Sequence, residues 1–231
     1  MVQPRAHLPY REFTTTTIIT MPGLSLWLSP PPSSPTCPAL TKLIADLAST
    51  HFPGPSPAPA PVFTPHITIT SNIPEDKVDP LAVVTTVAAV ATAPLSTDIS
   101  ATVVDTGPAY FKKIFLRIAP VSGLLEMARI ARENFVCSFQ PELDEPSVAA
   151  EIWLRAEYDP HLSLVYTDEW PLSSEKLDAV SALVFQALAG VVDSSDDDAA
   201  IGKLWRGGRV ELVKTTGPAD TWQVLAHCDI K

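Results

Sequence analysis

Pro65-His66-Ile67-Thr68-Ile69 and Pro160-His161-Leu162-Ser163-Leu164 repeat one short pattern, with the two histidines 95 residues apart. Each copy follows a proline and places a histidine two positions before a hydroxyl residue, with aliphatic residues between and after. In a β-strand, residues i and i+2 point to the same face. The pattern therefore predicts two strands, each with a histidine and a hydroxyl on one face and aliphatic side chains on the other.

Two imidazoles, each beside a hydroxyl, suit acid–base chemistry on a phosphate. The unperturbed pKa of histidine lies near neutrality, so one neutral and one protonated ring can coexist. The hydroxyls of Thr68 and Ser163 can donate hydrogen bonds to phosphate oxygens, where charge builds up. One such motif alone is often just a partly buried strand histidine. The repetition favours a shared site, because His7, His51 and His227 lack the pattern.

Local signals along the chain predict an alternation of strands and helices. Strands are expected at Leu24–Ser29, His66–Ser71, Ser100–Thr106, Lys113–Ala119, His161–Tyr166, about Arg209–Lys214 and about Thr221–Ile230. Helices are expected from a Thr36 cap to before Pro53, from an Asp79 cap to about Ala93, from Ser122 to about Phe135 and from about Ser173 to Leu188. Residues 142–157 are expected to form a loop and a helical turn or two.

This order of hairpins and crossover helices predicts an α+β fold with mainly antiparallel sheets. The two histidine strands fall in corresponding places of two rough halves of the chain. We therefore expect a bilobal, pseudo-twofold molecule with two antiparallel sheets and flanking helices. Residues 1–20 are expected to be a disordered tail, with a weak transit peptide as the alternative, and 21–231 to form a single bilobal domain.

Composition excludes several classes of function. The chain has 231 residues, of which 46% are hydrophobic and 18% charged, enough for a substantial core. Sixteen Lys and Arg against 26 Asp and Glu give a net charge of −10, which argues against binding to a long nucleic acid. The sequence contains no run of about 18 apolar residues, so no membrane span is predicted.

The cysteines and the absence of metal motifs set further expectations. Three widely spaced cysteines and no signal peptide favour reduced thiols in a cytoplasmic protein. Neither a Cys-x-x-Cys pair nor a His-Glu-x-x-His motif is present, and no carboxylate cluster suggests Mg²⁺. We therefore expect no metal and no cofactor, and we expect a monomer.

The repeated motif and three other stretches resemble a known family. The pattern is similar to the signature of the two-histidine phosphoesterase superfamily, and the chain resembles its eukaryotic cyclic-nucleotide phosphodiesterase branch, which includes ADP-ribose cyclic phosphate phosphodiesterases. The stretches that carry the resemblance are Leu24–Pro31, Phe63–Ser71, Tyr110–Leu116 and Trp222–Leu225. It covers about Gly23 to Asp229 and leaves out the tail and the acidic loop Asp193–Asp198.

The resemblance implies two lobes that face each other across a central cleft, each with one histidine and one hydroxyl residue. The implied catalytic residues are His66, Thr68, His161 and Ser163. The implied reaction is metal-free opening of a cyclic phosphate. Typical substrates are ADP-ribose 1″,2″-cyclic phosphate, formed downstream of tRNA splicing, and nucleoside 2′,3′-cyclic phosphates, which are opened to 2′-phosphates.

Tyr166 resembles a family tyrosine that touches the substrate. In a regular strand, Tyr166 would face away from His161 and Ser163, so this role requires the strand to end or bulge near Val165. A packed tyrosine at the strand end is the alternative interpretation.

Other roles are also open. His161 is hypothesised to be the general base and His66 the general acid, with the reverse assignment retained. Lys112, Lys113 and Arg117 could add positive charge to the cleft or, for the lysines, simply be solvated at the surface. The aromatic residues Trp27, Phe63 and Trp222 could stack on a base or pack in the core.

Two other functions compete with hydrolysis of a small cyclic nucleotide. One is RNA-end processing by an enzyme of the same superfamily, which the net charge disfavours. The other is a catalytically silent nucleotide-binding module, which would not need both imidazoles. Comparing turnover of a cyclic mononucleotide with turnover of an oligonucleotide that carries a cyclic end would separate small-molecule hydrolysis from RNA-end processing. The effect of His66→Ala on turnover would test the second alternative.

Overall fold

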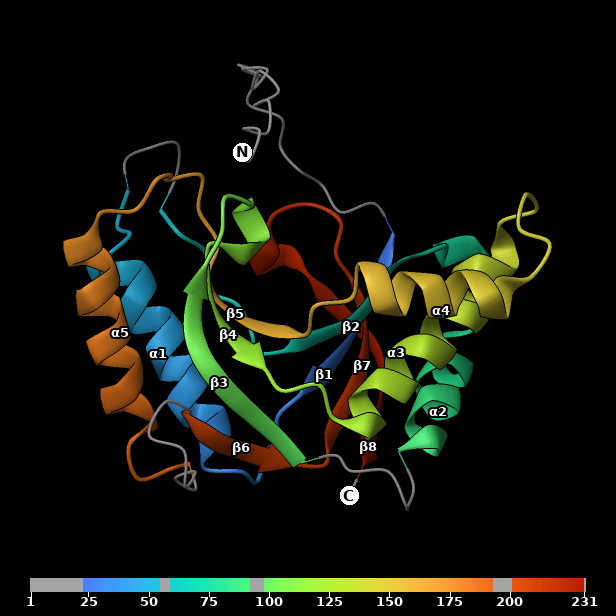
Figure 1. Cartoon of the computed structure of the whole chain (residues 1–231), viewed down its shortest axis with the longest axis horizontal. Coiled ribbons are helices and arrows are strands. Elements are labelled where there is room, and N and C mark those ends of the chain that lie inside the picture. The colour runs from blue at the N-terminus through green and yellow to red at the C-terminus, as the bar shows by residue number, and fades with distance from the viewer. Residues whose placement is uncertain (1–22, 55–58, 92–97, 193–200, 231) are drawn as a thin grey trace, which may run out of the picture.

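A computed structural model describes residues 23–54, 59–91, 98–192 and 201–230, and within them eight strands form one curled antiparallel sheet (Figure 1). The strand order is β6-β3-β4-β5-β2-β1-β7-β8. The strands are β1 (Leu24–Ser29), β2 (Ile67–Ile73), β3 (Asp98–Thr106), β4 (Ile114–Ile118), β5 (His161–Val165), β6 (Gly202–Arg206), β7 (Gly208–Lys214) and β8 (Gln223–Ile230). The α+β class is therefore confirmed.

Helices cover one face of the sheet in two groups. The α-helices are α1 (Thr36–Thr50), α2 (Pro80–Val90), α3 (Ser122–Phe135), α4 (Pro146–Ala156) and α5 (Ser174–Leu188). The short 3-10 helices are η1 (Glu75–Lys77), η2 (Tyr110–Lys112), η3 (Cys137–Phe139) and η4 (Ala219–Thr221). Helices α1 and α5 pack together on the side of β5, whereas α2 and α3 pack on β7, β8 and β2, with α4 against α3 (Figure 1).

The predicted aliphatic positions form the core between sheet and helices. Leu26 and Leu28 of β1, and Ile67 and Ile69 of β2, are fully buried against the helices. The predicted stripe of α1 is buried as well: Leu40, Leu43, Ile44 and Leu47. Burial of each such side chain contributes about 1.5–3 kcal/mol, so the aliphatic pattern fixes which face of each strand is left for the histidines.

The two histidine motifs lie side by side at the centre of the sheet. Among the described residues, β2 and β5 are paired through Ile67 and Leu162. This pair joins the halves β6-β3-β4-β5 and β2-β1-β7-β8 into one sheet. The expectation of two separate sheets is therefore wrong, because the two central strands hydrogen-bond to each other. The expected lobes and pseudo-twofold relation stay predictions.

Antiparallel pairing also sets which motif residues are neighbours. Extending the register by one residue on each side of the Ile67–Leu162 pair places His66 beside Ser163 and Thr68 beside His161. Each histidine is therefore the cross-strand neighbour of the hydroxyl residue from the other motif.

Several local predictions differ from the structure. Thr36 is the first residue of α1 rather than its cap, and its hydroxyl donates to the carbonyl of Leu204 at 2.5 Å, which ties α1 to β6. Helix α4 is longer than the predicted turn or two, and α2 ends at Val90, before the predicted Ala93. The cap of α2 is confirmed, because the Asp79 carboxylate accepts from the amide of Ala82 at 3.1 Å.

Strand β6 has no counterpart in the prediction, since it is a short edge strand that begins at Gly202 and ends just before Gly207. The expected tail 1–20 and the acidic loop Asp193–Asp198 lie outside the described residues. None of the helices in the described ranges combines the length and the apolarity that crossing a membrane requires.

Candidate active site

The two motifs meet in one pocket on the sheet face opposite the helices. Its volume is about 220 Å³. The lining residues are Trp27, His66, Thr68, Phe111, Lys112, His161, Ser163, Tyr166, Thr215 and Trp222. All five predicted site residues are among them, so segments almost 100 residues apart in the chain form one cavity.

Both histidine rings are held by the same main-chain contact. Nδ1 of His66 lies 2.6 Å from the carbonyl oxygen of Thr64, and Nδ1 of His161 lies 2.8 Å from that of Asp159. In each case the partner lies two residues earlier in the chain. A carbonyl oxygen only accepts hydrogen bonds, so each Nδ1 must carry the proton. Nε2 of each ring is therefore left to accept or donate a proton in the pocket.

His66 lies in an aromatic environment. Its ring stacks on Trp27, with centroids 3.6 Å apart and planes inclined by 10°. Phe63 meets the ring edge-on at 6.1 Å, and the Tyr166 hydroxyl lies 3.5 Å from Nε2. The pKa of His66 is lowered to about 4, chiefly by burial and to a smaller extent by the charge of His161, while the contact with the Thr64 carbonyl opposes the fall. This ring is therefore neutral at pH 7.

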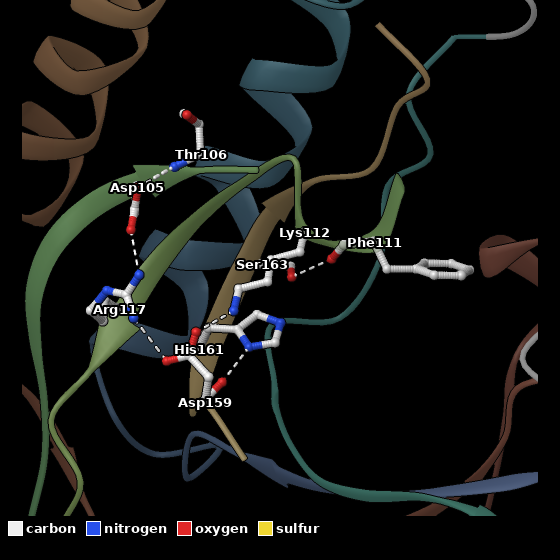
Figure 2. Close-up of polar contacts among 8 residues, drawn as sticks. All are labelled: Asp105, Thr106, Phe111, Lys112, Arg117, Asp159, His161 and Ser163. Atoms are coloured by element: carbon white, nitrogen blue, oxygen red, sulfur yellow. Dashed lines mark hydrogen bonds and ion pairs between the residues drawn. The ribbon is translucent and has the colours of Figure 1, made fainter. Parts of the chain in front are cut away.

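His161 lies in a charged environment (Figure 2). Phe115 packs edge-on against its ring at 5.4 Å. The Asp159 carboxylate accepts from Lys112 at 2.5 Å and from Arg117 at 2.8 Å. Burial lowers the pKa of His161, the carbonyl and the charge of Asp159 raise it, and the charges of Lys112 and Arg117 lower it.

The two hydroxyl residues have different hydrogen-bond surroundings. Ser163 Oγ donates to the carbonyl of Phe111 at 2.7 Å (Figure 2). Thr68 pairs with Trp27 across β1 and β2, and its carbonyl accepts from the hydroxyl of Tyr158 at 3.3 Å. Ser163 must therefore rotate its hydroxyl away from Phe111 before it can donate to a ligand in the pocket.

Tyr166 reaches the pocket because the strand stops before it. Strand β5 ends at Val165, and its register with β4 shifts at Leu164. The strand therefore both ends and shifts register near Val165, which is what Tyr166 needs in order to face the same side as His161 and Ser163. The residue is buried, and its ring stacks on Phe63 at 3.9 Å. Burial raises the pKa of its hydroxyl. Contact with a substrate stays a prediction.

The other aromatic candidates divide between pocket and core. Trp27 and Trp222 line the pocket, with ring centroids 5.6 Å apart. Phe63 is a core residue behind Tyr166. Core packing is confirmed for Phe63, and Trp27 is buried as well although it lines the pocket. Stacking of Trp27 or Trp222 on a base stays a prediction.

The basic candidates also divide. Lys112 lines the pocket, whereas Lys113 is 1% exposed, with Nζ donating to the carbonyl of Pro108 at 2.9 Å. Surface solvation was the wrong interpretation for Lys113, because β4 begins beneath the η2 turn and the Trp170 ring, 5.0 Å from Nζ. Arg117 is ion-paired to Asp105 and Asp159.

Two lining residues were not predicted as site residues. Phe111 belongs to η2, and Thr215 directly follows β7, with Oγ1 donating to the carbonyl of Gly23 at 3.2 Å. Neither belongs to the repeated motif; the pairing of β7 with β1, which carries Trp27, is what brings Thr215 to the pocket. Within the described residues, no three or more His, Cys, Asp and Glu side chains group so as to hold a metal ion. The expected metal independence stays a prediction.

Comparisons with known proteins bear on the family of this chain. A family model described as "Cyclic phosphodiesterase-like protein" matches residues 21–230. A protein of Yarrowia lipolytica named 2′,3′-cyclic-nucleotide 3′-phosphodiesterase is 34% identical over 229 residues, covering 90% of this chain and 99% of that protein. Proteins with the same name from Neurospora crassa and Saccharomyces cerevisiae are 30% and 28% identical over 89% and 90% of this chain, and 98% and 100% of their own lengths. The match to the family spans nearly the whole chain, and this chain belongs to the cyclic phosphodiesterase-like family.

Proposed function

We propose that this protein hydrolyses nucleoside 2′,3′-cyclic phosphates to nucleoside 2′-phosphates by acid–base catalysis with His66 and His161. The observation that carries the proposal is the convergence of two Nδ1-anchored imidazoles and two hydroxyls in one pocket. Relatives that match most of the chain are named 2′,3′-cyclic-nucleotide 3′-phosphodiesterases, which specifies the bond.

The proposed reaction needs two proton transfers. Water attacks phosphorus and a P–O bond forms while the bond from phosphorus to O3′ breaks. One imidazole accepts the proton of the attacking water, and the other gives its proton to O3′, which leaves as the 3′-hydroxyl. Thr68 and Ser163 donate hydrogen bonds to the non-bridging oxygens as charge builds there. The imidazoles account for both proton transfers, so the reaction requires no metal ion.

We assign His161 as the base and His66 as the acid. Lys112 and Arg117 beside His161 favour its neutral form. The face of Trp27 against His66 favours a protonated ring, since an indole face attracts a cation. His66 must also gain its proton in a buried site where its pKa is about 4 without ligand. The bound phosphate supplies the negative charge that raises this pKa.

ADP-ribose 1″,2″-cyclic phosphate is a second proposed substrate, because its reactive group is also a five-membered cyclic phosphate on ribose. Under this proposal each four-stranded half of the sheet acts as one lobe and supplies one histidine and one hydroxyl. A monomeric, cytoplasmic enzyme of small-molecule nucleotide metabolism downstream of tRNA splicing fits the proposal. Sedimentation of the purified protein and cell fractionation would test the first two properties.

The test is an assay with EDTA-treated protein and 2′,3′-cyclic AMP, with the product identified by ³¹P NMR. We expect adenosine 2′-phosphate, full activity in EDTA, and a loss of about 10³-fold in kcat for either His66→Ala or His161→Ala. The control is His227→Ala, an exposed histidine of β8 outside the motif. A 3′-phosphate product, or activity that EDTA abolishes and Mg²⁺ restores, would contradict the proposal.

The pH dependence adds a second readout. Both kcat and kcat/KM should be bell-shaped, and the limbs of kcat should lie at higher pH than those of kcat/KM, because bound phosphate raises the pKa of both imidazoles. A flat profile between about pH 5 and 9 would exclude two titrating imidazoles. Binding of 2′,3′-cyclic AMP by the wild type without turnover beyond that of His66→Ala would favour the silent-binder alternative. Faster turnover of an oligonucleotide with a cyclic end would favour RNA-end processing.

A further inference from the structure

A chain of four charged side chains lies beside His161 (Figure 2). Asp105 accepts from Arg117 at 2.5 Å, Arg117 donates to Asp159 at 2.8 Å, and Asp159 accepts from Lys112 at 2.5 Å. Asp105 also accepts from the amide of Thr106 at 2.7 Å, which fixes its carboxylate at the end of β3. The chain therefore runs from a secured carboxylate to Lys112, which lines the pocket.

Asp159 is the member of this chain that also touches the histidine. Its carbonyl lies 2.8 Å from Nδ1 of His161, while its carboxylate is held by two cations. The next residue, Pro160, is held as well, because its carbonyl accepts from the amide of Ile118 at 3.1 Å. Rotation of the Asp159 peptide would turn the carbonyl that orients the ring, and the two ion pairs oppose that rotation.

Lys112 and Arg117 also lie against the ring of Phe115, which contacts His161. Nζ of Lys112 lies 4.7 Å from the centroid of Phe115, and the guanidinium carbon of Arg117 lies 5.8 Å from it. Phe115 in turn meets His161 edge-on. Asp159 therefore acts on His161 by two routes: directly through its carbonyl, and indirectly by holding Lys112 and Arg117 against Phe115.

The corresponding position in the other motif lacks this arrangement. Thr64, two residues before His66, is exposed and has no charge, so its carbonyl alone contacts Nδ1. There, the stacked Trp27 holds the ring. The carboxylate at position 159 is thus a feature of one half of the site and not a requirement of the motif.

We infer that Asp159 is a positioning residue for the reaction, which orients His161 through its carbonyl and keeps Lys112 at the pocket wall through its carboxylate. This inference rests on the proposed function. Asp159 itself touches no reacting atom, so its removal should impair the proton transfer at His161 more than substrate binding.

The charges around His161 predict a second consequence. Those that face the ring are Lys112 and Arg117 from β4 and its preceding turn, Asp159 from its own segment, and His66 across the sheet. Loss of the Asp159 carboxylate removes a charge that raises the pKa of His161 and leaves two cations that lower it. The pKa of His161 should therefore fall. Because these side chains are partly exposed, the fall should shrink as salt is added.

The experiment compares Asp159→Asn with wild type in kinetics against 2′,3′-cyclic AMP and in NMR titration of His161. We expect kcat to fall about 10-fold to 100-fold with KM unchanged or lower, because a misplaced base loses the aligned geometry while the released lysine can still meet the phosphate. The titration midpoint of His161 should move to lower pH. Asp159→Glu, which keeps the charge, should restore the midpoint more fully than it restores kcat.

The matched control is Asp229→Asn, because Asp229 accepts from Arg209 at 2.6 and 3.2 Å in a surface ion pair of β7 and β8 that does not line the pocket. It should leave kcat and the His161 midpoint unchanged. If Asp159→Asn does not fold, Lys112→Met removes one partner of the carboxylate and should raise the His161 midpoint, because it deletes a neighbouring cation.

The outcomes separate this inference from the proposed function. Wild-type protein that leaves 2′,3′-cyclic AMP intact, or a fully active His161→Ala, would refute the proposed hydrolysis by two histidines. An inactive His161→Ala together with a folded Asp159→Asn whose kcat and midpoint match wild type would overturn the inference alone.

Discussion

The two halves of the pocket hold the same motif in opposite surroundings. Both histidines use Nδ1 to donate to the carbonyl two residues earlier, so the motif sets the tautomer in the same way twice. His66 is then held by a stacked indole, and His161 by a carboxylate with two cations. The comparison teaches that the repeated sequence fixes which nitrogen is available, whereas the neighbouring strands decide how readily that nitrogen takes a proton.

The strongest way to break the comparison is a substrate that does not need an acid. In a 2′,3′-cyclic AMP with sulfur in place of O3′, the leaving thiolate departs without a proton. With His66 as the acid, His66→Ala should lose about 10³-fold on the oxygen substrate and less than about 10-fold on the sulfur substrate. His161→Ala should lose about 10³-fold on both. If His161→Ala, and not His66→Ala, regains activity on the sulfur substrate, His161 is the acid and His66 the base.

The second prediction sharpens the comparison through stability. The pKa of His66 is lowered from about 6.5 to about 4, so the unfolded chain takes up this proton before the folded one does. The stability that the neutral ring preserves is present above about pH 6.5 and is lost as pH falls toward 4. Linkage puts the loss at about 3 kcal/mol between pH 7 and pH 4.

Urea unfolding at both pH values, for wild type and His66→Gln, would measure this loss. The variant should lose less stability on acidification than wild type does. His161→Gln should reduce the loss of stability on acidification less than His66→Gln does, because Asp159 opposes the effect of burial on the pKa of His161. An acid dependence identical in wild type and His66→Gln would show that burial does not keep His66 neutral.

The third and smallest effect concerns the rings against the histidines. Trp27→Leu removes the stacked surface and should lower kcat about 10-fold, because His66 gains freedom to turn about its Nδ1 contact. Phe115→Leu removes only an edge contact, and Asp159 still orients His161, so its loss should be smaller. Steady-state kinetics would compare the two, with Trp27→Phe as the ring-preserving control and melting temperatures to verify folding. Equal losses would mean that the stack has no special role.

Much of the site was predictable because it depends on local periodicity. The alternation around His66 and His161 set the strand faces, and the helical stripe of α1 set the other side of the core. The β2–β5 pair that unites the sheet was not predictable, because strand pairing between distant segments is decided by packing of the whole sheet.

Sequence periodicity was also silent on the surroundings of the motif. Lys113 alternates with the apolar Ile114 in the way a surface lysine would, yet η2 and Trp170 cover it. The ion pairs of Asp159 depend on Lys112 and Arg117, more than 40 residues away in the chain. Such contacts are set by tertiary structure and leave no periodic trace in the sequence.

The main-chain contact of His66 makes that half of the active site insensitive to replacement of the residue that orients the ring. Every residue supplies a carbonyl, so substitutions at position 64 that preserve the backbone conformation leave the proton of His66 on the same nitrogen. A triad that orients its histidine with a carboxylate loses that control when one side chain is replaced. The carbonyl that orients His66 lies only two residues before it in the chain. A segment of a few residues could therefore be moved onto another antiparallel sheet and still present its imidazole in the tautomer that the chemistry uses.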